Sequence, residues 1–260
     1  MANKRSPSVR RPVRSLYTSI TGVDYGYVPK RWVKMFAAIL LLIPCSVLTL
    51  AFFHAFLRTA EGGHFRSSEE LKWFVIGGLV GIVWFFAFKP LQLLYVMGHE
   101  LTHALWVRLH GGTVHDFEVR EQGGHIVTDK TNTAIILAPY FFPFYTVCWT
   151  AAYGVAVFLL GVPDNVGLLF GGIGFTWVLH LAYTVAMILK GQPDLEYGGV
   201  FFSLMIIYPA NLVFIAGLLV IASPSVTWSS FGADLLRYAM EVSALIVQVV
   251  EGMLRWGGAF

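Results

Sequence analysis

The chain has 260 residues, of which 57% are hydrophobic and only 13% are charged, and its mean hydropathy is +0.67. This composition excludes an ordinary soluble globular domain. Several apolar runs reach the roughly 20 residues that span a bilayer, so we predict an all-α polytopic membrane protein with about six transmembrane helices. Both cysteines, Cys45 and Cys148, lie within apolar runs, which argues against a disulfide framework or a cysteine metal site.

Residues 1–32 form a basic tail. The net charge of the whole chain is only +3, but the first 34 residues carry a single acid, Asp24, against many basic residues. These are Lys4, Arg5, Arg10, Arg11, Arg14, Lys30, Arg31 and Lys34. Positive charge before a first span favours the cytoplasmic side and anionic lipid. We expect a multi-pass integral protein of the plasma (inner) membrane, with a cytoplasmic N-terminus, the lipid bilayer as a partner and no nucleic-acid partner.

The membrane-embedded core is predicted to extend over residues 33–222. Its apolar runs are 33–57, 73–88, 91–109, 134–160, 166–189 and 198–222. The run 73–88 gives only about 24 Å of helix, short of a full crossing. If it joins 91–109 as one helix broken at Pro90, the chain has six spans including a last one in 223–260. If Lys89 and Pro90 form a tight hairpin, there are seven; we favour six, although this places Lys89 near mid-membrane.

The helix predicted for residues 91–109 contains His99, Glu100 and His103 in an H-E-x-x-H pattern. Residues four apart on a helix lie nearly one above the other, so both imidazoles can reach one metal ion. The carboxylate beside them can accept a proton from a water that the metal activates. Ionisable groups inside an apolar helix are costly, which favours a functional role. The alternative is that the histidines only bond to neighbouring helices, which leaves Glu100 without a role.

A polar loop, residues 109–132, follows the motif. Val114, Phe117 and Val119 alternate partly with charged residues, a glycine-containing turn is predicted at 121–124, and an apolar stretch resumes at 125–128. This pattern predicts a small β-hairpin. The hairpin is either an ordinary connection or an edge strand that holds an extended substrate beside the metal.

A hydrolytic zinc site needs three protein ligands and keeps one position for water. We favour Asp194 as the third ligand, because it follows a Gly and a Pro where a transmembrane helix must loosen, and such breaks persist only where they are buried or line a cavity. A wet interfacial loop is the alternative, and His180 is the rival ligand. Gln192, Asn211 and His180 are candidates for binding substrate or an oxyanion, with ordinary interhelical bonding as the alternative.

Residues 223–260 contain the last predicted helix, 234–255, which is either amphipathic or transmembrane. Its charged residues fall within one stripe. The pairs Arg237/Glu241 and Glu251/Arg255 are four apart and can form ion pairs. The helix either lies in the membrane interface or spans with its stripe against the bundle or another subunit. Nothing in the chain indicates an oligomeric state.

The chain resembles the site-2 protease family of intramembrane zinc metalloproteases in three features. These are the HELTH sequence in a transmembrane helix, the hairpin after it, and QPDLEYGG after a later span. The resemblance covers about residues 91–200. It implies a zinc ion held by His99, His103 and Asp194, Glu100 as general base, and a membrane protein's transmembrane or juxtamembrane segment as substrate. The second motif departs from the family, in which the aspartate follows an Asn-Pro element and precedes Gly, whereas Asp194 precedes Leu195.

We therefore predict an intramembrane zinc metalloendopeptidase that cleaves a peptide bond in or near a transmembrane segment of a membrane protein. Glu100 is expected to deprotonate the attacking water and to pass the proton to the leaving amine. A helical substrate has to unwind locally. The rival hypothesis is a non-catalytic membrane sensor, assembly factor or carrier that retains the metal-site scaffold.

Overall fold

A computed structural model describes residues 20–21, 31–63, 67–87, 91–120 and 123–257. The described residues are mostly helical, with 81% of them in helices. Most of the predicted basic tail, 1–32, lies outside the described residues. Lys89 and Pro90, on which the choice between six and seven spans depended, also lie outside them.

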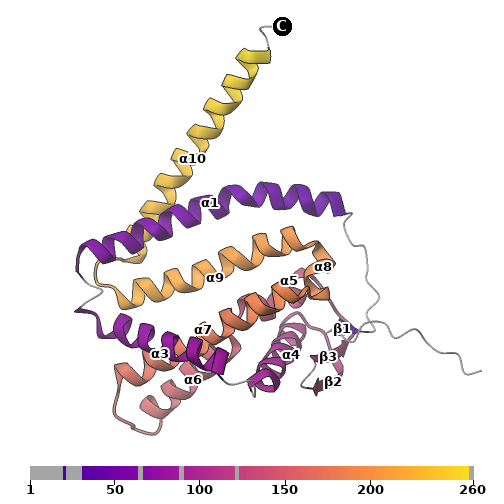
Figure 1. The fold of residues 1–260 in the computed structure, drawn as a ribbon, viewed down its shortest axis with the longest axis vertical. Helices are drawn as coiled ribbons and strands as arrows, with labels where there is room; N and C mark the ends of the chain where they lie inside the picture. Colours follow the sequence, from indigo (N-terminus) through magenta and orange to yellow (C-terminus); the bar gives the residue numbers. More distant parts are fainter. Residues whose placement is uncertain (1–19, 22–30, 64–66, 88–90, 121–122, 258–260) are drawn as a thin grey trace, which may run out of the picture.

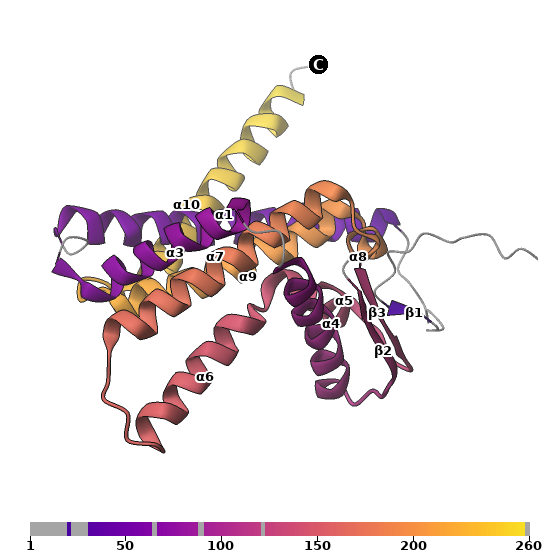
Figure 2. The same ribbon diagram turned by 60° about the horizontal axis from the view of Figure 1, so that its bottom comes forward.

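The helices are α1 (Arg31–Glu61), α3 (Glu69–Ala87), α4 (Leu91–Leu109), α5 (Thr133–Phe141), α6 (Phe144–Phe158), α7 (Val166–Lys190), α8 (Pro193–Gly198), α9 (Val200–Ala222) and α10 (Trp228–Gly257). Among the described residues, α1, α3, α7 and α9 are long and apolar enough to cross a membrane, and α5 with α6 makes a fifth span if the pair crosses as one. This supports an integral membrane protein, but the predicted count of six is not confirmed. Figures 1 and 2 show α4 turning away from the line of α3, so the two do not form one straight helix.

The helix ends follow from local chemistry. Asn132 and Asn165 cap α5 and α7, because each side chain accepts a hydrogen bond from a backbone N–H three residues further on. Helix α7 ends at Lys190, and the next residue, Gly191, has a φ of 73° in the left-handed region that glycine adopts easily. Pro193 then opens α8, at a position where a helix needs no backbone donor.

The apolar run 134–160 is not one straight helix. Phe142 precedes Pro143 and has an extended backbone, with φ −97° and ψ 106°, because a proline ring disfavours the helical conformation in the residue before it. Helix α5 therefore ends at Phe141, and α6 leaves at an angle of 67°. The bend keeps α5 packed against α4 and sends α6 outward, as Figure 2 shows.

Small residues allow α3 and α7 to pack closely. A Cβ atom on Gly77 would lie 1.9 Å from the carbonyl oxygen of Gly171, and one on Gly174 would lie 2.1 Å from the carbonyl oxygen of Phe74. Backbone atoms cannot move aside for such a contact, so both helices need glycine at the crossing. The two helices therefore pack closely against each other (Figure 1).

The sheet lies against α4. Strands β2 (Val114–Arg120) and β3 (Gly123–Thr128) form an antiparallel pair, which confirms the predicted hairpin (Figure 2). The Asp129 carboxylate accepts a hydrogen bond of 2.6 Å from the backbone N–H of Thr113, and this lowers the pKa of Asp129. Strand β1 (Ile20–Thr21) was not predicted and pairs in parallel with the other edge of β3, so that the order is β1-β3-β2.

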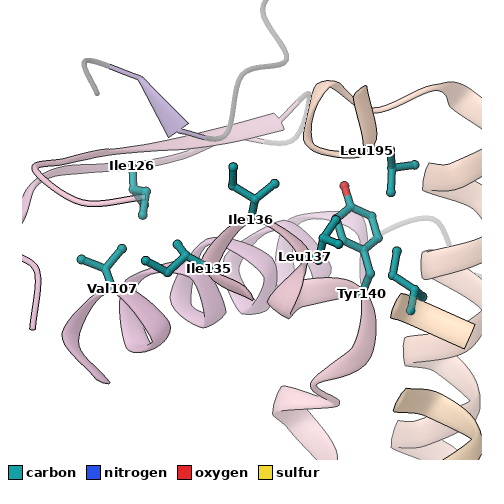
Figure 3. Close-up of a cluster of buried hydrophobic side chains, with 8 residues drawn as sticks. Val107, Ile126, Ile135, Ile136, Leu137, Tyr140 and Leu195 are labelled. Atoms are coloured by element: carbon teal, nitrogen blue, oxygen red, sulfur yellow. The ribbon is translucent and has the colours of Figure 1, made fainter. Parts of the chain in front are cut away.

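A buried core beside the hairpin joins elements that are far apart in the chain (Figure 3). Its members are Val107 of α4, Ile126 of β3, Ile135, Ile136, Leu137 and Tyr140 of α5, Leu195 of α8 and Ile207 of α9. Burying an aliphatic or aromatic side chain of this size stabilises by about 1.5–3 kcal/mol. The cluster therefore holds the short helix α8 against α4 and α5, and with it the residue that precedes Leu195.

Helix α10 is anchored near its start by a buried acid. Asp234 is only 5% exposed and accepts a hydrogen bond of 2.5 Å from Arg58, while His54 Nδ1 lies 3.0 Å from its other oxygen. Beyond this point α10 leaves the rest of the protein (Figure 1). The ion pairs predicted along it are present, Arg237–Glu241 at 3.4 Å and Arg255–Glu251 at 3.5 Å.

We expect Gly77→Ala to lower the free energy of unfolding by about 1–3 kcal/mol or more, because the added methyl group would collide with the backbone of α7. Thermal unfolding of the purified protein in detergent measures the loss as a lower midpoint. The matched control is Gly232→Ala on α10, where a Cβ atom meets nothing within 4 Å. Equal midpoints for the two variants would contradict the proposed packing.

Candidate metal centre

Helix α4 presents His99 and His103 on the same side, one turn apart. Their Nε2 atoms lie 3.2 Å from each other, and the rings meet edge to face with centroids 4.8 Å apart. His103 is fully buried, and the side chain of His99 is 9% exposed. Both nitrogen atoms are thus directed at one point that solvent barely reaches.

Asp194 reaches the same point from the other side. It stands in the first turn of α8, the short helix between the end of α7 and the start of α9. Its Oδ2 atom lies 3.4 Å from His99 Nε2 and 3.6 Å from His103 Nε2, and the residue is 5% exposed. The predicted break after α7 therefore takes the form of a separate helical turn that carries the carboxylate inward.

The three donor atoms fit a single metal ion. In a tetrahedral site with bonds of about 2.0–2.1 Å, neighbouring ligand atoms are about 3.3 Å apart. The observed separations among His99, His103 and Asp194 are 3.2, 3.4 and 3.6 Å. Among the described residues, these three form the group that could hold a metal ion. Their donor atoms are compatible with a metal but do not identify it as zinc.

Neighbouring groups orient two of the three ligands. The Nδ1 atom of His103 lies 2.8 Å from the carbonyl oxygen of Ile135, and because a carbonyl only accepts, Nδ1 carries the hydrogen and Nε2 keeps its lone pair. The Tyr140 hydroxyl donates to Asp194 Oδ2 at 3.0 Å. Tyr140 is itself held by its carbonyl oxygen, which accepts from Asn211 Nδ2 at 2.9 Å. Sequence reasoning missed Ile135 and Tyr140.

Glu100 lies beneath the hairpin. It is only 2% exposed, and its Oε2 atom has no hydrogen-bond partner within the part of the chain that the structure describes. A Cβ atom on Gly124 of β3 would lie 2.6 Å from Glu100 Cγ, so the glycine allows the strand to cross directly over this side chain. An acceptor in this position, next to the histidine pair, is free to take a proton.

The remaining predicted residues have different surroundings. His180 of α7 shares the lining of a cavity with His99 but is not part of the metal-holding group found among the described residues. Gln192 donates to the Met187 sulfur at 3.1 Å. Asn211 donates to the carbonyl oxygens of Tyr140 and Ile207 at 2.9 Å each, which uses both of its N–H bonds. The oxyanion role of these residues stays a prediction.

We expect His99→Ala, His103→Ala and Asp194→Ala each to lower the metal content of the purified protein at least tenfold, because each removes one of the three donors. Elemental mass spectrometry measures the content. His110→Ala, just beyond the end of α4, is the control, since the His110 side chain contacts Trp106 and is not part of the donor group. If Asp194→Ala keeps its full metal content and His180→Ala loses metal, then His180 and not Asp194 is the third ligand.

Tyr140→Phe keeps the aromatic packing but removes the hydrogen bond to Asp194. Losses of such supporting contacts weaken metal binding by about 10–100-fold, and we expect an effect of that size. Competition with a chelator of known affinity measures it. Phe141→Leu, on the same helix and outside the donor set, serves as the control; equal affinities in the two variants would show that the Tyr140 hydroxyl does not support the site.

No protein-family model, curated protein or solved structure matches this chain. What the site can do is therefore inferred from its own residues. Two imidazoles and a carboxylate are brought within ligand distance of one another. Beside them lies the carboxylate of Glu100, whose Oε2 atom has no hydrogen-bond partner among the described residues.

Proposed function

We propose that this chain is an intramembrane zinc metalloendopeptidase of the site-2 protease type, which cleaves a peptide bond in or near a transmembrane segment of a membrane protein. One observation carries the proposal: His99, His103 and Asp194 converge at 3.2–3.6 Å, next to Glu100, whose Oε2 atom has no hydrogen-bond partner in the described part of the chain. Three ligands that leave one position open, together with a neighbouring base, are the parts that hydrolysis requires.

The donor set suits zinc, for which imidazole and carboxylate are ordinary ligands. When bound, a zinc ion would supply Lewis-acid chemistry, lowering the pKa of water and polarising the carbonyl to be attacked. Glu100 accepts the proton of the attacking water and returns it to the amine of the leaving chain. The carbonyl of Ile135 and the hydroxyl of Tyr140 keep His103 and Asp194 oriented throughout.

The hairpin supports a peptide as the substrate. Strand β3 crosses Glu100 at Gly124, and extended chains bind to sheets by pairing with a strand. In the structure β3 pairs with the two-residue strand β1 along the edge away from β2, and an extended substrate would make a pairing of this kind. A helical substrate segment would have to unwind before it could pair in this way.

We expect Glu100→Gln to lower cleavage at least about 10³-fold, because the amide cannot accept the proton, while the metal content stays unchanged. N-terminal proteomics of membranes from cells that express either form is the measurement. New N-termini within or near transmembrane segments should appear with the wild type and not with the variant. Glu241→Gln, an exposed position on α10, is the control and should behave as the wild type.

Identical sets of N-termini from the wild type and Glu100→Gln would contradict the proposal. With metal still bound in both, that result would favour the rival function, a membrane sensor, assembly factor or carrier that uses the metal site without hydrolysis.

A further inference from the structure

Helix α8 carries the third donor of the metal-holding group, yet it is only six residues long. Isolated helices shorter than about 12–15 residues are marginal even when their sequence favours helix. The carbonyl groups of the last turn of any α-helix have no partner within that helix, and in α8 this turn makes up most of its length. The place of Asp194 therefore depends on what other elements bind to α8.

Two carbonyl groups of α8 accept hydrogen bonds from side chains of other helices. The buried Ser203 hydroxyl of α9 donates to the carbonyl oxygen of Leu195 at 3.0 Å. Lys34 Nζ, in the first turns of α1, donates to the carbonyl oxygen of Tyr197 at 3.1 Å. Figures 1 and 2 both show α8 beside the start of α1. The short helix is thus attached to two long apolar helices that are far from each other in the chain.

The ammonium group of Lys34 is directed into the protein. The residue is 6% exposed, and Nζ lies 4.4 Å from the centre of the Tyr197 ring and 5.9 Å from that of Phe202. A lysine near the end of a membrane helix usually extends its ammonium group to the interface, and burying the charge is costly unless partners compensate. The carbonyl end of a helix is such a partner, because it carries partial negative charge. Lys34 is therefore bound to the end of α8 and not to the membrane surface.

We propose that Lys34, together with Ser203, positions the third donor of the metal centre. Tyr197 belongs to the same short helix as Asp194, so the bond from Lys34 fixes where the carboxylate lies. Asp194 Oδ2 has to stay 3.4–3.6 Å from the two imidazoles, and a binding site of this kind tolerates displacements of only about 0.5 Å. Lys34 is a positioning residue, which touches neither metal nor substrate. The inference rests on the metal centre of the proposed function.

Lys34→Met keeps an unbranched side chain of similar length but removes the donor and its charge. We expect zinc affinity to fall about tenfold, the lower end of the 10–100-fold that supporting contacts contribute. Competition with a chelator of known affinity, on the full-length protein in nanodiscs, measures it. Arg31→Met is the matched control, because it makes a similar change at the exposed first residue of α1 and should bind zinc as the wild type does. Lys34→Arg, which keeps a cationic donor, should recover most of the loss.

A double-mutant cycle separates positioning from a general loss of stability. Zinc affinity is measured for Asp194→Ala with and without Lys34→Met. Because Lys34 acts through Asp194, we expect the two forms to bind zinc equally once the carboxylate is absent. A merely structural role would weaken both backgrounds alike. Thermal midpoints without metal establish that each variant is folded. If Lys34→Met does not fold, Ser203→Ala removes the other side-chain donor to α8 and replaces it in the cycle.

Wild-type zinc affinity in Lys34→Met, or an equal loss with and without Asp194, would overturn the inference. Either result would leave the protease function standing, because cleavage by the wild type and by Glu100→Gln tests that function separately. A loss of affinity confined to the background that keeps Asp194, without cleavage that depends on Glu100, would retain the positioning role and remove the protease function.

Discussion

The metal-holding group depends on keeping the carboxylate of Asp194 against two imidazoles in a place that water barely reaches. An unpaired buried carboxylate costs several kcal/mol, so its partners have to be held firmly. The hydrophobic core fixes α8 through Leu195, the residue next to Asp194. At the other end of α8, the buried Lys34 of α1 donates to the carbonyl oxygen of Tyr197 at 3.1 Å, with its ammonium group 4.4 Å from the centre of the Tyr197 ring. The short helix is thus held at both ends.

Much of the site could be predicted, because its chemistry is local in the chain. The spacing of His99 and His103 follows from helix geometry, and the Gly and Pro before Asp194 mark the break that carries it inward. The alternation after the motif helix predicted the hairpin. These features are each set by a few neighbouring residues, and such features leave a recognisable pattern.

The supporting contacts could not be predicted, because they join distant parts of the chain. Ile135 contributes only a backbone carbonyl, which any residue at that position would supply. Tyr140 stands in an uncharged run, where a tyrosine has many possible partners. Lys34 was assigned to a basic stretch near the membrane surface, yet it is 6% exposed and bound to α8. The number of spans could not be predicted either, because the length of an apolar run does not reveal the 67° bend between α5 and α6.

The fold separates a rigid frame from a more open side. Glycines let α3 and α7 approach until backbone meets backbone, which leaves no space between them. On the opposite side of α7, the bend before α6 leaves the cavity beside His99. One surface of α7 is thus closed by tight helix packing, while another borders a cavity that His99 also lines.

The crossing of β3 over Glu100 also fixes the register of β3. Side chains alternate between the two faces of a strand, so a slip of one residue reverses every position. A slip in one direction would bring His125 to the place of Gly124, where Glu100 leaves no room for a side chain. A slip in either direction would turn Ile126 out of the core. The register of β3 is therefore dictated by steric fit on its inner face, and a shift of that register would be felt at the carboxylate of Glu100.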